Sequence, residues 1–314
     1  MTEQNLRDLS IDLIDRNPEN PRTIFRPQEM SSLLESIRKH GVQVPISVYK
    51  SDGRYILIDG ERRWRCSIKL NRKTIPALIQ PAPDSLTNLL LMFNIHALRE
   101  QWDLFTIAAK LPRVIELLAK RLGKPPVERE ISGETGLNVA VIRRCKLLID
   151  LPDKHKDIII RELQKPKAQQ KFTEDFYIEM ERSLKTVERS MPQVVAELGK
   201  EKIRERLIAK YKDGTITNRV DFRQIAKIAR ADRVSADTEK AANALIKLFS
   251  DNDVSIERAY SESVGAAYQE RDVLTTVSSL AKQLQSIGFE ELDAEMLEAL
   301  RDLRDDLDRL LGVQ

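Results

Sequence analysis

The pattern of apolar and polar positions changes near residue 80. Before that point, short apolar runs bounded by turn residues predict strands over 45–49, 55–59 and 74–79. Between the first turn signals and these strands, one amphipathic helix is predicted from three- and four-residue spacing of Met30, Leu33, Leu34 and Ile37, with its end at His40-Gly41. This alternation predicts a small α/β domain.

Beyond Ser85, nearly every periodic segment has helical spacing. Pro112 is expected to kink or restart one of these helices. Pro81 and Pro83 interrupt the earlier pattern, and the basic, polar segment 165–171 marks a second break. We therefore expect an α+β fold divided into residues 1–82, 83–165 and 166–314, in which everything after the first domain is predominantly helical.

Two apolar stripes lie near the C-terminal end. One steps by three, four and three residues through Leu274, Val277, Ala281 and Leu284. The other steps by four, three, four and three through Met296, Leu300, Leu303, Leu307 and Leu310. Such heptad-like stripes pair either with each other or with a second chain, and the spacing alone does not distinguish the two.

The formal net charge of +3 conceals a segregation of charge. Residues 290–311 carry nine acidic and three basic side chains, whereas residues 199–233 carry eleven Lys and Arg against five Asp and Glu. A basic body favours nucleic acid, because neutralised phosphates release counterions. The simpler interpretation of any single charge is a solvated helix face.

Several classes of protein are disfavoured by composition. No run of 18 apolar residues occurs, so we expect no membrane partner. The first residues lack a basic-then-apolar signal segment, which favours a cytoplasmic location. Cys66 and Cys145 fall on apolar helix faces and are expected to be buried thiols. Three isolated histidines make a structural zinc site improbable.

A phosphate-binding turn is predicted at Gly60, where the strand 55–59 meets a helix that begins with Glu61, Arg62, Arg63 and Arg65. Glycine permits a tight turn, and the helix start presents unpaired N–H groups and a positive dipole end. Guanidinium forks suit phosphate oxygens. The alternative is a charged first turn that only faces water.

A helix-turn-helix is predicted between Val127 and Asp150. Gly133 would allow close helix contact, and Gly136 would supply the turn. The expected inward residues of the second helix are Leu137, Ile142 and Cys145. Asn138 is a good N-cap, and the expected DNA-facing set is Asn138, Val141, Arg143 and Arg144. Arg144 is our choice for the base-reading arginine, since Asn138, Val141 and Arg144 step by three along one face. A plain helical hairpin is the alternative.

The order of these motifs resembles the ParB chromosome- and plasmid-partition family. The segments that carry the resemblance are NPENPR (17–22), HGVQVPISV (40–48), GRYILIDGERRWRCSIKL (53–70) and IPALI (75–79), and it extends over roughly residues 8–155. The resemblance implies that this domain binds CTP with Mg²⁺ and that the following helix-turn-helix binds double-stranded DNA. It implies a nucleotide site made by Arg22 on the base side, by Gly60, Glu61, Arg62, Arg63 and Arg65 at the phosphates, and by Asn94 near the metal.

One family motif departs from its pattern. ParB-like proteins carry Glu-Asn-x-Gln-Arg after the first helix that follows the turn, and here the matching positions are Phe93, Asn94, Ile95, His96 and Ala97. Phe93 removes an acceptor oxygen for a hard cation such as Mg²⁺. Nucleotide binding is still expected, whereas a weak CTPase or NTPase activity stays an open question.

The resemblance implies a nucleotide-switched DNA-binding protein in DNA partition, plasmid maintenance or related regulation. It would be a homodimer associated with the nucleoid or a plasmid, with a ParA-like ATPase as a further partner. Two alternatives stay open. One is an ATP-using nuclease or kinase-like enzyme of the same fold, with Glu61 or Glu100 as general base. The other is a helix-turn-helix regulator without nucleotide dependence.

Overall fold

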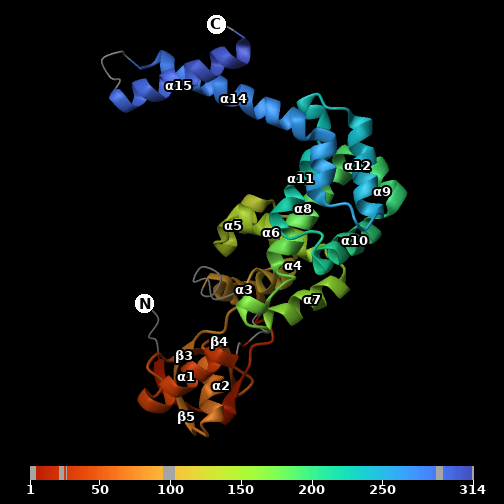
Figure 1. Ribbon diagram of the computed structural model, residues 1–314. Coiled ribbons are helices and arrows are strands. Elements are labelled where there is room, and N and C mark those ends of the chain that lie inside the picture. Colours follow the sequence, from red (N-terminus) through yellow and green to blue (C-terminus); the bar gives the residue numbers. More distant parts are fainter. Residues whose placement is uncertain (1–4, 21–24, 26, 95–102, 288–292, 313–314) are drawn as a thin grey trace. The chain divides into compact units, whose positions relative to one another are not determined.

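The computed structural model describes residues 5–20, 25, 27–94, 103–287 and 293–312 (Figure 1). Its internal contacts divide the chain into two compact units, residues 1–182 and 183–314, and each is described by itself. The division falls inside helix α8 (Glu174–Ser190). The finer separation at residues 82 and 165 stays a prediction.

The first unit begins with a five-stranded mixed sheet in the order β1-β5-β3-β4-β2. The strands are β1 (Asn5–Ser10), β2 (Ile14–Asp15), β3 (Ile46–Ser51), β4 (Arg54–Asp59) and β5 (Thr74–Gln80). β1 pairs antiparallel with β5, which pairs parallel with β3. β3 pairs antiparallel with β4, which pairs parallel with β2. The three strands predicted from the pattern are therefore confirmed, and β1 and β2 complete the two edges.

Alternating residues of the sheet build its core. Ile46 and Val48 are fully buried while the residues between and after them are partly open, as the two-residue period of a strand requires. The core cluster consists of Leu9, Ile11, Ile14, Ile46, Val48, Leu57, Ile75 and Ala77. Helices α1 (Pro27–His40) and α2 (Glu61–Lys69) share a second cluster made by Met30, Ile37 and Cys66.

Helices make up the rest of the first unit, up to the start of α8. They are α3 (Ser85–Met92), α4 (Leu104–Leu122), α5 (Glu128–Thr135), α6 (Val139–Ile149) and α7 (Asp153–Leu163). The expectation that Pro112 would restart a helix is wrong, because α4 continues through it. The side chain of Asp103 caps this helix by accepting the Thr106 N–H at 2.8 Å.

The second unit is helical throughout its described residues. It contains the end of α8, α9 (Pro192–Leu198), α10 (Lys200–Asp213), α11 (Phe222–Ile228), α12 (Thr238–Ser250), α13 (Ile256–Tyr260), α14 (Ala266–Gln285) and α15 (Ala294–Leu311). Its core includes Leu207, Phe222, Leu245 and Leu248. The predicted α+β class with a helical remainder is confirmed. Among the described helices, none combines the length and the apolar character needed to cross a bilayer.

Candidate functional sites

The turn at Gly60 joins β4 to α2 and has the geometry that the sequence predicts. Gly60 has φ 97°, in the left-handed region that favours glycine. A Cβ at this position would lie 2.6 Å from Cγ2 of Ile46, so the residue is also fixed by close packing against β3. The first helical bond runs from the Trp64 N–H to the Gly60 carbonyl at 3.0 Å. The N–H groups of residues 61–63 therefore have no acceptor within the helix.

Glu61 holds the preceding loop against α2. Its side chain is buried, with 4% exposed, and one oxygen accepts the Asn20 amide at 2.6 Å. The other oxygen accepts Arg65 Nη2 at 2.6 Å and Nε at 2.8 Å. A carboxylate with partners on both oxygens organises the loop that carries the NPENPR segment. The same contacts make it a poor general base, because a base needs a free oxygen facing its substrate.

The three arginines of the turn have protein partners, which sequence reasoning missed. Arg63 is the most enclosed, with 18% of its side chain exposed, and donates to the carbonyls of Val44 and Pro45 at 2.6 and 2.9 Å and to Asp59 at 3.0 Å. Arg62 donates to the Glu29 carbonyl at 3.0 Å. The three carbonyl acceptors lie 18 to 33 residues away in the chain, so the local pattern could not reveal them, whereas Asp59 lies only four residues from Arg63.

Two of these arginines still reach the surface. The side chains of Arg62 and Arg65 are 32% and 36% exposed. Each guanidinium carries five N–H donors, so one or two protein partners leave donors for an anion. The Arg65 guanidinium also stacks on Phe25, with Cζ 4.3 Å from the ring centroid. Arg62 and Arg65 are therefore better placed than Arg63 to meet a phosphate.

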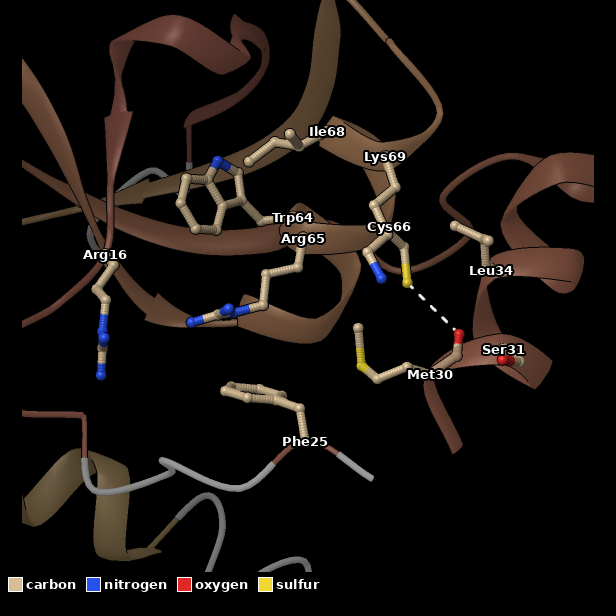
Figure 2. Close-up of a pocket in the computed structure, with 10 residues that line it drawn as sticks. All are labelled: Arg16, Phe25, Met30, Ser31, Leu34, Trp64, Arg65, Cys66, Ile68 and Lys69. Carbon is tan, nitrogen blue, oxygen red and sulfur yellow. Dashed lines mark hydrogen bonds between the residues drawn. The ribbon is translucent and has the colours of Figure 1, made fainter. Parts of the chain in front are cut away.

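A cavity of about 560 Å³ lies along α2 (Figure 2). Its lining residues are Arg16, Phe25, Met30, Ser31, Leu34, Trp64, Arg65, Cys66, Ile68 and Lys69. Most of this lining is apolar, and three cations border it. Figure 2 shows the Phe25 ring beneath the Arg65 guanidinium, opposite Trp64. The cavity can hold a ligand in which a flat or apolar group lies next to a negatively charged group.

The metal ligand set is incomplete in the described residues. Asn94 is exposed at the end of the helical segment that continues α3, whereas Phe93 is fully buried in the core. Arg22, His96, Ala97 and Glu100 lie outside the described residues. Within the described part of the chain, no group of three His, Cys, Asp or Glu side chains is placed to hold a metal ion. The turn at Gly60 thus offers N–H donors, but the described residues include no such group of three ligands beside it.

Helices α5 and α6 form the predicted helix-turn-helix. Gly136 ends α5 with φ 71°, and the Asn138 side chain caps α6 by accepting the Ala140 N–H at 2.7 Å. Leu137, Ile142 and Cys145 are buried as expected. Burial raises the pKa of the Cys145 thiol to about 12, so this cysteine is an unreactive core group. Gly133 has no neighbour that a Cβ would meet, so its predicted role in close helix contact is wrong.

The two arginines of α6 differ in their partners. Arg143 is 68% exposed and donates to Glu128 of α5 at 2.7 Å. Arg144 is 38% exposed and donates to Asp175 of α8 at 2.6 Å. Lys146, which sequence reasoning missed, lies 3.2 Å from the same Glu128 carboxylate. Its three-residue spacing from Arg143 was the available signal.

The remaining predicted residues of this helix differ in accessibility. Asn138 is exposed, but its side-chain oxygen serves the helix cap, and Val141 is only partly open. Arg143 is therefore the most exposed cation of α6, whereas Lys146 and Arg144 are 40% and 38% exposed and are paired with Glu128 and Asp175. This arrangement suits a helix that presents its first two turns to a polyanion.

Comparison with known proteins identifies the family of this chain. A family model for the ParB N-terminal domain matches residues 1–94. The nucleoid occlusion protein of Geobacillus thermodenitrificans is 31% identical over 198 residues, which cover 56% of this chain and 70% of that protein. The chain belongs to the ParB family. The probable chromosome-partitioning protein ParB of Pseudomonas putida is 30% identical over 159 residues, covering 50% of this chain and 52% of that protein.

The likeness to ParB-family proteins is partial in length. The chain spans about half of the Pseudomonas putida ParB, and the family model ends at Asn94, before the helix-turn-helix. Among solved structures, a C-terminally truncated ParB from Caulobacter crescentus complexed with CTP-gamma-S is 26% identical, with a TM-score of 0.29, and covers 50% of this chain and 85% of that one. The same protein complexed to the centromeric parS site is 21% identical, with a TM-score of 0.41, and covers 71% and 98%.

Proposed function

We propose that this ParB-family chain is a nucleotide-switched DNA-binding protein that acts in DNA partition, plasmid maintenance or related regulation. The observation that carries the proposal is the occurrence, in one unit, of a glycine turn with free helix N–H groups and an intact helix-turn-helix. CTP is the nucleotide that the family resemblance implies. Association with the nucleoid or a plasmid, and a ParA-like ATPase as partner, follow from the same resemblance.

In this proposal, the N–H groups of residues 61–63 and the open donors of Arg62 and Arg65 hold the phosphates. Arg63 and Glu61 support the turn from inside. Arg22 would line the base side, and Asn94 would approach the phosphate or Mg²⁺. Because Phe93 stands where the family has glutamate, we propose binding rather than turnover as the function of this site. The enzyme alternative receives no support from Glu61, whose oxygens are both engaged.

The nucleotide site predicts a measurable affinity. Isothermal titration of the full chain with CTP, ATP and GTP should give binding heat for CTP, and Arg62→Ala should weaken it about 10- to 100-fold, since a charge-assisted bond contributes about 1.5–3 kcal/mol. Arg38→Ala is the matched control, because Arg38 is an exposed α1 arginine paired with Glu35. Absence of heat with all three nucleotides, with and without Mg²⁺, would defeat the proposed switch.

We further propose that α6 enters the major groove of double-stranded DNA. Arg144 is the base-reading arginine that the sequence predicts, but Arg143 is more exposed and Arg144 is bonded to Asp175. Both bonds are made with carboxylates, so DNA binding by either arginine requires exchange of its partner. The structure therefore supports Arg143 as base reader, with Lys146 at the phosphates.

Substitution of the two arginines separates these roles. Selection of bound sequences from random duplexes should yield a motif, and Arg143→Ala should reduce affinity for it by about 1–3 kcal/mol and relax one position. Arg144→Ala should leave the motif unchanged and weaken all duplexes alike. The reverse outcome would restore Arg144 as the base reader, and a selection without any enriched motif would contradict sequence-specific binding.

Homodimerisation is proposed through α14 and α15. Several stripe residues are exposed within the described second unit, namely Leu274, Val277 and Leu284 on α14 and Met296, Leu307 and Leu310 on α15. Exposed apolar residues at heptad-like spacing are typical of helices that pair with another chain. A dimer built this way would present two α6 helices and would favour an inverted-repeat DNA site.

A further inference from the structure

A group of cations and tyrosines occurs in the second unit. We name it the basic–aromatic cluster, and its members are Lys227, Arg230, Arg233, Tyr260, Tyr268 and Arg271. They come from four parts of the fold: the end of α11, the 3₁₀ turn Ala231–Val234 with the residue before it, the end of α13, and the first turns of α14.

The tyrosine rings hold the cations in place. The Lys227 ammonium lies 5.1 Å from the ring centroid of Tyr268 and 5.5 Å from that of Tyr260. The Arg271 guanidinium lies 4.6 Å from the Tyr268 centroid. The negative face of an aromatic ring attracts such cations. The Tyr268 ring thereby fixes the positive side chains of Lys227 and Arg271, although their charges repel each other.

The other two arginines belong to the same electrostatic environment. Burial raises the pKa of the Tyr268 hydroxyl, and the charges of Arg271, Arg230 and Arg233 oppose that rise. The hydroxyl itself donates to the Lys227 carbonyl at 3.2 Å, which ties α14 to the end of α11. Lys227 and Arg271 thus lie on the ring of Tyr268, which has only 4% of its surface exposed, and the charges of Arg230 and Arg233 also act on its hydroxyl.

Few ion pairs engage the cations of this cluster. Within the described part of the chain, the ion pair made by its cations is the 3.8 Å contact between Arg271 and Asp272. Arg230 has its Nε buried without a hydrogen-bond partner among the described groups. Asp232 and Glu270 are the other acidic residues that adjoin members of the cluster in sequence, and both are exposed. Cations held together with one long ion pair among the described groups keep donors available for an anion.

We propose that the basic–aromatic cluster is a second phosphate-binding surface, which holds the backbone of double-stranded DNA without reading its sequence. The proposal rests on the DNA binding proposed for α6 and adds a surface in the other unit. Guanidinium forks match phosphate oxygens, and Lys227, Arg233 and Arg271 are exposed. Tyr268 is covered by its cations, so it supports the site and does not stack on bases. This favours backbone contact, which is independent of sequence.

The salt dependence of DNA binding tests the proposal. The affinity of the full chain for a mixed-sequence duplex that lacks the selected motif is measured between 50 and 200 mM salt, roughly the range in which phosphate contacts dominate. Combining Arg233→Gln with Arg271→Gln should flatten the slope of log affinity against log salt by about 1.8, and Arg233→Gln alone by about 0.9. The matched control combines Lys202→Gln with Lys212→Gln, two exposed α10 cations outside the cluster.

The outcomes of this experiment distinguish a failure of the cluster proposal from a failure of the proposed function. Thermal unfolding of each variant shows that it is folded, and the single Arg233→Gln variant keeps the test valid if the Arg271 change disturbs α14. Slopes for the cluster variants that equal the control slope, in a parent that binds DNA, overturn the cluster alone. A parent that binds no duplex overturns both proposals. Unchanged DNA slopes with altered sedimentation of the DNA-free cluster variants would identify an acidic protein surface, such as α15 of a second copy, as occupant and would overturn the DNA proposal.

Discussion

Replacing Gly60 by alanine should destabilise the N-terminal sheet and its helix much more than the same change at Gly53. Both glycines have positive φ, 97° and 81°, and a side chain there costs about 1–2 kcal/mol. At Gly60, the new Cβ would also lie 2.6 Å from Cγ2 of the fully buried Ile46. Overpacking of this kind adds about 1–3 kcal/mol. Denaturant unfolding followed by circular dichroism measures the difference.

Gly53 is the matched control because a Cβ there would meet no atom within 4 Å. Gly60→Ala should also weaken CTP binding, since moving the turn displaces the N–H groups of residues 61–63. Equal losses of stability for the two variants would show that β3 yields easily to the added methyl group. In that case the turn would be set by backbone conformation alone.

Lys210→Met should be among the most destabilising single substitutions in the second unit. The Lys210 side chain is 1% exposed, and its ammonium donates to the carbonyls of Asp251, Asn252 and Val254 at 2.6, 3.0 and 2.5 Å. These carbonyls follow the end of α12, where helix acceptors lack internal donors. Methionine keeps the packing but leaves them unpaired, at a cost of about 3–5 kcal/mol. Equilibrium unfolding in urea measures this loss in the free energy of unfolding.

Lys212→Met provides the control on the same helix, because Lys212 is exposed and should change stability by less than about 0.5 kcal/mol. Burial lowers the pKa of Lys210, and the neighbouring Asp251 and Asp213 carboxylates oppose that shift. The charged form of Lys210 is therefore less favourable in the folded protein than in the unfolded chain. At pH values where this lysine is charged, the pKa shift lowers the stability of the fold. If Lys210→Met proved neutral, the loop after α12 would have to find donors in water.

Much of the fold could be predicted from the sequence because each strand, turn and helix is marked by residues that are close together in the chain. The short apolar runs in 45–49 and 55–59, the glycine at residue 60 and the helical spacing after Ser85 each depend on neighbours within a few residues. The cap at Asn138 and the turn at Gly136 were confirmed for the same reason. The short strand β2 was missed because two residues carry no readable period.

The backbone turn at Gly60 could be predicted from the sequence, whereas the partners of the surrounding side chains could not. Position and residue type predict the glycine turn at Gly60, but the carbonyl acceptors of Arg62 and Arg63 and the carboxylate acceptor of Arg144 lie 18 to 33 residues away. The same holds for Glu61, which bonds Asn20 across 41 residues. Only the tertiary fold determines which cations are already engaged and which remain open to a ligand.

The buried amide pair of Asn17 and Asn88 constrains how the first unit can move. The Asn17 Nδ2 donates to Asn88 Oδ1 at 3.1 Å, and the two residues are 1% and 5% exposed. Through Asn20, the same loop is bonded to Glu61 at the start of α2. A displacement of α3 must therefore either carry this loop along or strand two buried amides, which is costly. The loop consequently acts as a tether that couples the orientation of α3 to the turn at Gly60.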